Sequence, residues 1–164
     1  MRRGALLSWV LALTLAAATP AAAQKSADTL RVAWRDAIPN LDPYYNQLRV
    51  GLVLAHQAWD TLIYRDPETL TLKPLLAVAW RQTDPITWEF DLRRGVRFQD
   101  GSPLTADDVV YTVETVIDDR RVQVGSNYAW IASAEKIDDH KVRLKAKRVF
   151  PAALEYLAMT LPIW

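Results

Sequence analysis

One stretch of the sequence decides the fold: residues 75–114 read LLAVAWRQTDPITWEFDLRRGVRFQDGSPLTADDVVYTVE. Apolar residues at positions 86, 88, 90 and 92 alternate with polar ones, and this period of two predicts a half-buried strand over 86–92 with a solvated polar face. Asp84-Pro85 before it and Asp100-Gly101 after it are turn signals, because proline fixes φ and glycine allows positive φ. The stretch therefore predicts a strand enclosed between two turns.

A helix is expected after the second turn. Thr105 is the expected N-cap, and Asp107 and Asp108 fall in the first helical turn, where carboxylates meet unpaired backbone N–H groups. Apolar residues then form one helical stripe: Ala106, Val109, Val110, Val113, Val116 and Ile117. The pattern predicts a helix over 105–117. The aspartate pair is also compatible with acid–base or metal chemistry, but a helix cap explains it better.

The same stretch resembles the signature region of the bacterial family 5 extracellular solute-binding proteins, the peptide- and nickel-type receptors of ABC importers. Their pattern is roughly A-x-x-W, a strand, L-R-x-G-V-x-F-x-D-G, and then a-D-D-V at a helix start. The matching residues are Ala77, Trp80, Leu92, Arg93, Gly95, Val96, Phe98, Asp100, Gly101, Ala106, Asp107, Asp108 and Val109. The resemblance implies an α+β (mixed α/β) fold: an incomplete lobe like that of type II periplasmic binding proteins, with the subdomain that the family adds.

The N-terminus has the features of a secretory signal peptide. Two arginines follow the first methionine, and residues 5–18 are mostly apolar. Residues 21–23 are alanines, the small residues that signal peptidase requires at its cleavage site. The apolar run is too short to span about 30 Å of hydrocarbon as a helix. We therefore expect a signal peptide over 1–23, cleaved after Ala23, and a mature chain over 24–164.

The composition argues against several classes of function. The sequence contains no cysteine, which excludes disulfides, thiolate chemistry, Cys-bound zinc and the lipidated cysteine of a lipoprotein. The net charge is +1, and no basic patch indicates nucleic-acid binding. His56 and His140 lack the spacing of a metal site, and no nucleophile motif or glycine-rich phosphate loop occurs. The sequence thus indicates no enzyme, no cofactor and no metal.

The expected elements outside the signature stretch are a strand over 29–34, a buried helix over 50–59, a strand over 61–64, a hairpin over 132–146 with its tip at 138–140, and a last helix that starts at Pro151. Together with the central strand and helix, they complete the α+β arrangement.

Four residues are candidates for contact with a ligand. Tyr44 and Tyr45 follow the turn at 41–43, which resembles the family's turn that delivers residues to the cleft, and aromatic rings with hydroxyls suit a pocket. Asn127 and Trp130 belong to a polar and aromatic loop, and in the resembled family an aromatic of this loop often faces the ligand. The alternatives are that one tyrosine packs while the other is half exposed, and that Trp130 packs against the hairpin.

The resemblance implies a function in transport. It predicts a periplasmic receptor that captures a peptide or a related small solute between two lobes and delivers it to an ABC permease in the inner membrane, without covalent chemistry. Family members are usually several times longer, so we expect this chain to supply at most part of one wall of the cleft and to bind peptides weakly or not at all by itself. The alternatives are a truncated relic without binding activity and, with less support, a small secreted enzyme.

Overall fold

The computed structural model describes residues 31–35, 37–46 and 48–164, and the expected signal peptide lies outside them. The chain divides into two compact units, and the second, residues 35–164, contains all the helices and strands described below.

The strand expected over 29–34 is wrong in its described part. Residues 29 and 30 lie outside the described residues, and residues 31–34 are exposed and form no strand. A strand is held by hydrogen bonds to a neighbour, and none of the strands in the described part of the chain pairs with residues 31–34.

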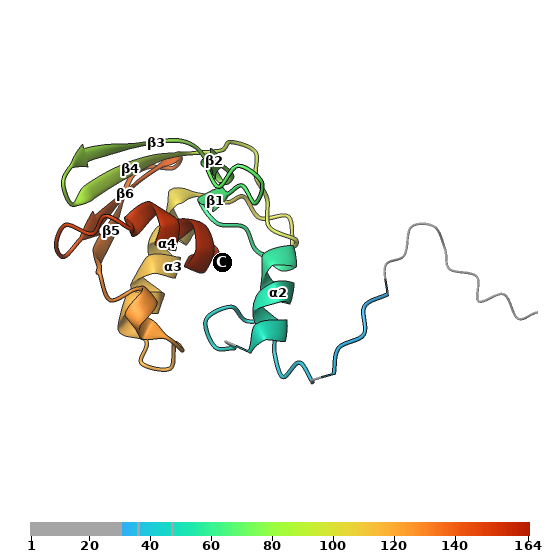
Figure 1. Cartoon of the computed structure of the whole chain (residues 1–164). Helices are drawn as coiled ribbons and strands as arrows, with labels where there is room; N and C mark the ends of the chain where they lie inside the picture. The colour runs from blue at the N-terminus through green and yellow to red at the C-terminus, as the bar shows by residue number, and fades with distance from the viewer. Residues whose placement is uncertain (1–30, 36, 47) are drawn as a thin grey trace, which may run out of the picture. The chain divides into compact units, whose positions relative to one another are not determined.

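The centre of the second unit is a four-stranded antiparallel sheet in the order β3-β4-β6-β5 (Figure 1). Its strands are β3 (Ala77–Asp84), β4 (Thr87–Leu92), β5 (Ile131–Asp138) and β6 (Lys141–Ala146). The strand predicted over 86–92 is confirmed as β4, and the predicted hairpin is confirmed as β5 and β6. The turn at Asp84-Pro85 is also confirmed, and in it the Asp84 carboxylate accepts a hydrogen bond of 2.9 Å from the backbone N–H of Ile86.

Most of the polar face of β4 is covered, whereas the alternation predicted a solvated face; only Asp91 near its end is exposed. Thr87 and Glu89 are only 5% and 7% exposed. Because β4 is a central strand, long side chains of its neighbours lie over it: Arg81 of β3 and Arg143 of β6 reach the Glu89 carboxylate at 2.6 and 2.7 Å. Ion pairs therefore take the place of water on this face.

These ion pairs belong to one row that crosses all four strands. The register places Arg81 opposite Glu89, Glu89 opposite Arg143, and Arg143 opposite Glu135. Hydrogen bonds from Arg143 and then Arg81 hold the pKa of Glu89 below its usual range. Since opposite charges across neighbouring strands stabilise their pairing, the row supports the register of the sheet.

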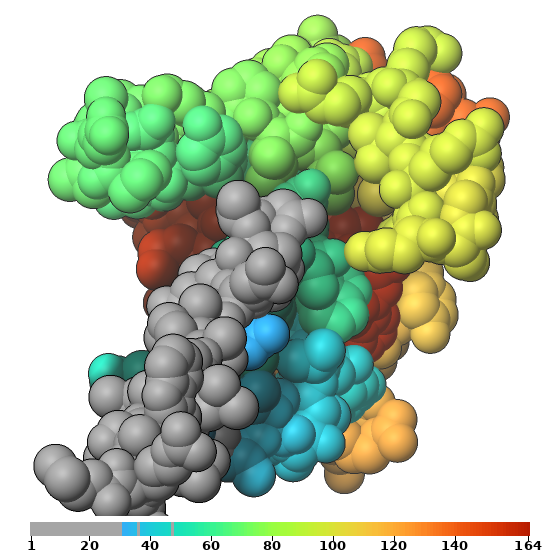
Figure 2. Space-filling model, turned by 90° about the vertical axis from the view of Figure 1, so that its right-hand side faces the viewer, coloured from blue at the N-terminus to red at the C-terminus, as the bar shows by residue number. Residues whose placement is uncertain are grey.

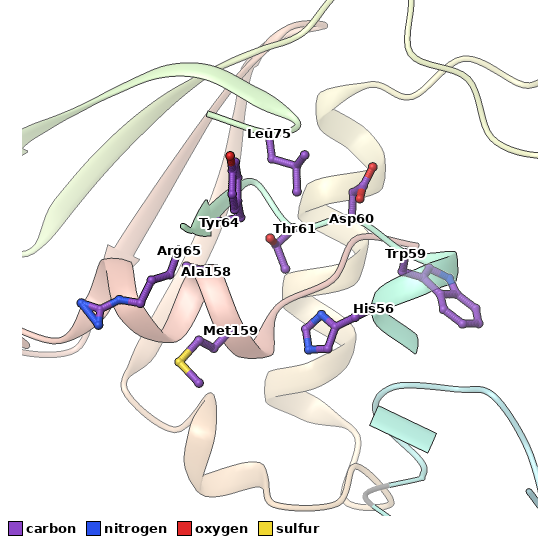
Figure 3. A pocket seen from close by; sticks show the side chains of 9 residues that line it. All are labelled: His56, Trp59, Asp60, Thr61, Tyr64, Arg65, Leu75, Ala158 and Met159. Atoms are coloured by element: carbon purple, nitrogen blue, oxygen red, sulfur yellow. The ribbon is translucent and has the colours of Figure 1, made fainter. Parts of the chain in front are cut away.

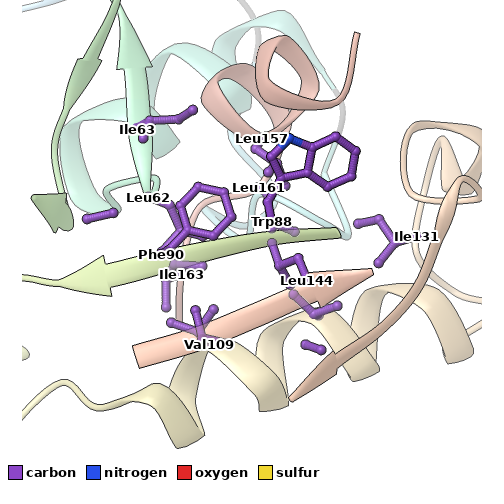
Figure 4. Close-up of a cluster of buried hydrophobic side chains, with 14 of the residues drawn as sticks. Leu62, Ile63, Trp88, Phe90, Val109, Ile131, Leu144, Leu157, Leu161 and Ile163 are labelled. Atoms are coloured by element: carbon purple, nitrogen blue, oxygen red, sulfur yellow. The ribbon is translucent and has the colours of Figure 1, made fainter. Parts of the chain in front are cut away.

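The apolar face of the sheet packs on α3 (Ala106–Asp118) and α4 (Ala153–Thr160) (Figure 4). Fully buried side chains from the sheet and the helices meet there, among them Phe90, Val109, Val113, Val142, Leu144, Leu157 and Leu161. Burial of a side chain of this size stabilises a fold by about 1.5–3 kcal/mol. The helix predicted over 105–117 is confirmed as α3. The last helix begins two residues after Pro151, which lies in the turn before it.

The start of α3 confirms that its aspartates have structural partners. Thr105 is the N-cap and forms a capping box with Asp108, whose carboxylate accepts the backbone N–H of Thr105 at 2.7 Å. Asp107 instead accepts a hydrogen bond of 2.6 Å from Lys136 of β5. The pair therefore caps the helix and ties it to the hairpin.

The loop 93–104 contains the two glycines of the signature. Gly95 and Gly101 have φ of 76° and 90°, in the left-handed region that disfavours any residue with a Cβ. The Asp100-Gly101 turn is thus confirmed. The loop, yellow in Figure 2, lies beside α2 (Arg49–Ala58, teal), and its Gln99 amide donates a hydrogen bond of 3.1 Å to the Ala58 carbonyl.

The helix expected over 50–59 is confirmed as α2, but it is not buried all round. Val50, Gly51 and Ala55 are buried, whereas Val53 is 43% exposed. The strand expected over 61–64 is shorter and shifted: β1 (Ile63–Arg65) pairs with β2 (Leu72–Pro74) in a separate two-stranded sheet. The exposure of Val53 shows that one face of α2 is open to solvent.

Candidate functional site

The four predicted ligand-facing residues lie in different environments. Tyr44 is fully buried, Tyr45 is partly exposed, Asn127 lines a small pocket, and Trp130 is 7% exposed. The structure does not bring all four to one cavity.

Tyr44 is a core residue rather than a wall of a cleft. Its hydroxyl donates a hydrogen bond to the carbonyl of Pro162, and its ring meets Tyr128 and Trp164 edge-on, with centroids 5.6 and 4.8 Å away. Burial raises the pKa of Tyr44 well above its usual value. The turn explains why Tyr44 points inward: the Asp42 carboxylate accepts hydrogen bonds from the backbone N–H groups of Tyr44 and Tyr45 and so fixes the direction of the chain.

Tyr45 is half exposed, which agrees with the alternative that one tyrosine of the pair packs inward while the other stays partly at the surface. Its ring stacks on Trp164, with centroids 6.1 Å apart and planes at 24°, and the Arg121 guanidinium lies 5.6 Å from its centroid. Its hydroxyl donates a hydrogen bond of 2.8 Å to Asp119, which raises the pKa of Tyr45. Arg121 pairs with the same carboxylate at 2.6 Å and is the main cause of the lowered pKa of Asp119.

Tyr111 extends this surface. It is 61% exposed, and its ring centroid lies 6.2 Å from that of Trp164. We name the whole surface the aromatic ledge and define it as Tyr45, Tyr111, Asp119, Arg121 and Trp164. It combines aromatic faces with a cation and an anion held at fixed positions.

Trp130 matches the packing alternative. Its ring stacks on Phe150 at 4.9 Å and meets Trp88 of the sheet edge-on at 6.2 Å. Its indole N–H donates a hydrogen bond of 2.9 Å to the carbonyl of Asn127. Most of the indole is therefore committed to the core.

A concave surface lies between α2 and α4. One pocket of about 400 Å³ (Figure 3) includes Tyr64 and Arg65 of β1, and another of about 230 Å³ includes Asn127. Both are lined by His56 and Met159, so we name the continuous surface the α2–α4 groove. A volume of several hundred Å³ is typical of small-molecule pockets.

Within residues 31–35, 37–46 and 48–164, no group of three or more His, Cys, Asp or Glu side chains could hold a metal ion. Over the same residues, every helix is too short or too polar to cross a membrane. What the ledge and the groove offer is aromatic surface, hydrogen-bonding groups and paired charges.

Sequence reasoning missed most of the ledge. Trp164, Asp119 and Arg121 lie far from Tyr45 in sequence, and only the tertiary fold brings them together. Tyr111 carried a signal, because it is a large aromatic residue outside the apolar stripe of its helix.

Comparison with known proteins identifies relatives of the chain. Residues 71–164, more than half of the chain, match the family described as "Bacterial extracellular solute-binding proteins, family 5 Middle". The glutathione-binding protein GsiB of Escherichia coli K12 is 31% identical over 160 residues, which are 96% of this chain and 31% of GsiB. The oligopeptide-binding protein AppA of Bacillus subtilis is 34% identical over 89 residues, 53% of this chain and 16% of AppA.

Solved structures give the same fold. MoaA of A. tumefaciens R10, in complex with mannopinic acid, has a TM-score of 0.69 and 28% identity over 75% of this chain and 26% of its own. AppA of B. subtilis with a nonapeptide has a TM-score of 0.65 and 28% identity over 73% of this chain and 24% of its own. The chain thus has the periplasmic-binding-protein fold and spans less than a third of the length of the relatives described here.

Proposed function

Because the chain belongs to the bacterial extracellular solute-binding proteins of family 5, we propose that it forms part of the ligand-binding lobe of a periplasmic receptor. This receptor captures peptides or related small solutes and delivers them to an ABC permease in the inner membrane. The features of a signal peptide over 1–23 support export and cleavage after Ala23.

The observation that carries the proposal is the aromatic ledge. Peptides present apolar side chains, which pack on aromatic faces, and charged termini, which need partners of opposite sign. The Arg121 side chain is 81% exposed although it pairs with Asp119, so donors of its guanidinium remain open to a ligand carboxylate. Tyr45 is positioned on both sides, by Trp164 and by Asp119, and is therefore preorganised to receive a ligand.

We expect this chain to bind a ligand only weakly, because the aromatic ledge forms a single wall of the proposed cleft. A ligand that rests on one wall keeps most of its surface in water, whereas a ligand site typically buries about 70–90% of a small ligand. The ligands named for three relatives provide the probes for this chain: glutathione, a nonapeptide and mannopinic acid.

Titration of the purified chain with these three probes, followed by tryptophan fluorescence, tests the proposal. We expect a saturable change with at least one probe, because Trp164 stacks on Tyr45. Tyr45→Ala should weaken it roughly tenfold, equivalent to about 1.4 kcal/mol. The matched control is Tyr64→Ala, which removes a half-buried tyrosine from the α2–α4 groove. If Tyr64→Ala weakens binding and Tyr45→Ala does not, the groove is the site and the proposed role of the ledge fails.

A further inference from the structure

A third pocket, of about 380 Å³, shares no residue with the aromatic ledge or the α2–α4 groove. Three segments build it: the loop that leads into β5, the chain that leaves β6, and α4. The side chains that give it its chemistry are Ser126, Trp130, Lys147, Arg148, Phe150 and Tyr156. We name it the hairpin-end pocket.

One side of the hairpin-end pocket is aromatic. Trp130 stacks on Phe150 with planes at 26°, and Tyr156 meets Phe150 edge-on with centroids 5.2 Å apart. Phe150 and Tyr156 are only partly buried, so their outer surfaces remain available. An aromatic ring of a ligand can therefore pack against this side with the geometry that the three rings already use among themselves.

The other side is cationic and has no partner. Lys147 and Arg148 are exposed, and no side-chain hydrogen bond or ion pair is formed by either of them within the described residues. This distinguishes them from Arg143, Lys141 and Lys136 of the same hairpin, each of which is paired with a carboxylate. The residues that line the pocket include no Asp or Glu.

The lining also supplies neutral donors. Neither the Ser126 hydroxyl nor the Tyr156 hydroxyl forms a hydrogen bond among the residues that the structure describes. Donors and positive charges thus line the pocket beside an aromatic surface, and the lining includes no competing carboxylate. A carboxylate accepts hydrogen bonds only, and such charge-assisted hydrogen bonds are the stronger kind.

We propose that the hairpin-end pocket binds small aromatic carboxylates. The carboxylate lies between Lys147 and Arg148, and the ring packs on Phe150 and Tyr156. This goes beyond the proposed function, because the pocket and the aromatic ledge share no residue and a ligand in one leaves the other open.

Amide shift mapping by NMR with three probes tests the inference on the whole chain. The probes are 3-phenylpropanoate, 3-phenylpropanamide, which lacks the charge, and propanoate, which lacks the ring. We expect 3-phenylpropanoate to shift the amides of Lys147, Arg148 and Tyr156 saturably. The other two probes should bind at least roughly tenfold more weakly, a difference of about 1.4 kcal/mol. In about 0.5 M NaCl the Debye length is only a few ångströms, so binding of 3-phenylpropanoate should weaken while binding of 3-phenylpropanamide should not.

Charge variants provide the matched comparison. The double variant Lys147→Gln, Arg148→Gln should weaken binding of the acid about tenfold, equivalent to about 1.4 kcal/mol. The control Lys145→Gln removes one positive charge from β6, just before these residues and outside the pocket, and should leave binding nearly unchanged. Equal binding of acid and amide, an equal loss in Lys145→Gln, or no shift at these amides would each overturn the inference. Shifts centred on Tyr45 and Arg121 would also overturn it, while leaving the proposed function intact.

Discussion

Replacing Trp130 with alanine separates a core role from a ligand role for this residue. Trp130 is 7% exposed, stacks on Phe150, meets Trp88 and donates a hydrogen bond of 2.9 Å to the Asn127 carbonyl. Truncation of a buried tryptophan to alanine costs about 3–5 kcal/mol, of which the hydrogen bond accounts for about 1 kcal/mol. Domains are stable by about 5–15 kcal/mol, so Trp130→Ala should remove a large share of the stability of this one.

Urea unfolding monitored by circular dichroism gives the measurement. With an m-value of about 2 kcal/mol per M, a loss of about 4 kcal/mol lowers the midpoint by about 2 M. Trp130→Phe keeps an aromatic ring and should recover most of this loss. The control Tyr111→Ala alters a side chain that is 61% exposed and should change the free energy of unfolding by no more than about 0.5 kcal/mol. A Trp130→Ala midpoint equal to that of Tyr111→Ala would show that the indole is not part of the core.

The remaining predictions concern the cap, a helix contact, acid stability and export. Thr105→Ala should lower the free energy of unfolding by about 1 kcal/mol in urea titration, because the capping box is lost; no change would refute the cap. Gly51→Ala should lower the melting temperature although alanine favours helices, because the new Cβ would lie 2.5 Å from the Asn46 amide nitrogen. The control Gly125→Ala has open space around its Cβ and should leave the melting temperature nearly unchanged. The lowered pKa of Glu89 means that its ionised form stabilises the fold above the ordinary carboxyl pKa, about 4.3, and that this contribution is lost as the pH falls through the folded-state value. Glu89→Gln should therefore lower the melting temperature at neutral pH and flatten its dependence on acid, and an unchanged acid profile would count against the ion-pair row. Intact-mass analysis of exported protein should give Gln24 as the first residue, and a retained leader would contradict the expected cleavage after Ala23.

Local patterns in the sequence were sufficient for β4, α3 and the β5–β6 hairpin. Each has its own periodicity and its own cap or turn, and each of these features acts over a few residues. The same patterns did not show the burial of Glu89. That burial depends on β4 being a central strand flanked by Arg81 and Arg143, and strand order is a property of the whole sheet.

The candidate site was less predictable for the same reason. Aromatic residues after a turn or in a loop can pack inward or face outward, and the sequence does not distinguish the two. Tyr44 packs inward, because the Pro162 carbonyl and the Trp164 ring, both far from it in sequence, contact it. Trp130 packs inward on the ring of Phe150 and donates its indole N–H to the carbonyl of Asn127, three residues before it. Tyr45 stays at the surface, where Trp164 and Asp119 define its position.

Peptide-induced amide shifts, mapped by NMR over the whole chain, test the central claim most directly, because the method detects weak binding. Titration with the nonapeptide should shift the amides of Tyr45, Arg121 and Trp164 together along one saturable curve. The amides of the outer face of the sheet, such as those of Glu89 and Lys145, should remain unshifted. Saturable shifts confined to the α2–α4 groove, or no shifts at millimolar peptide, would contradict the claim that the aromatic ledge is a wall of the ligand site.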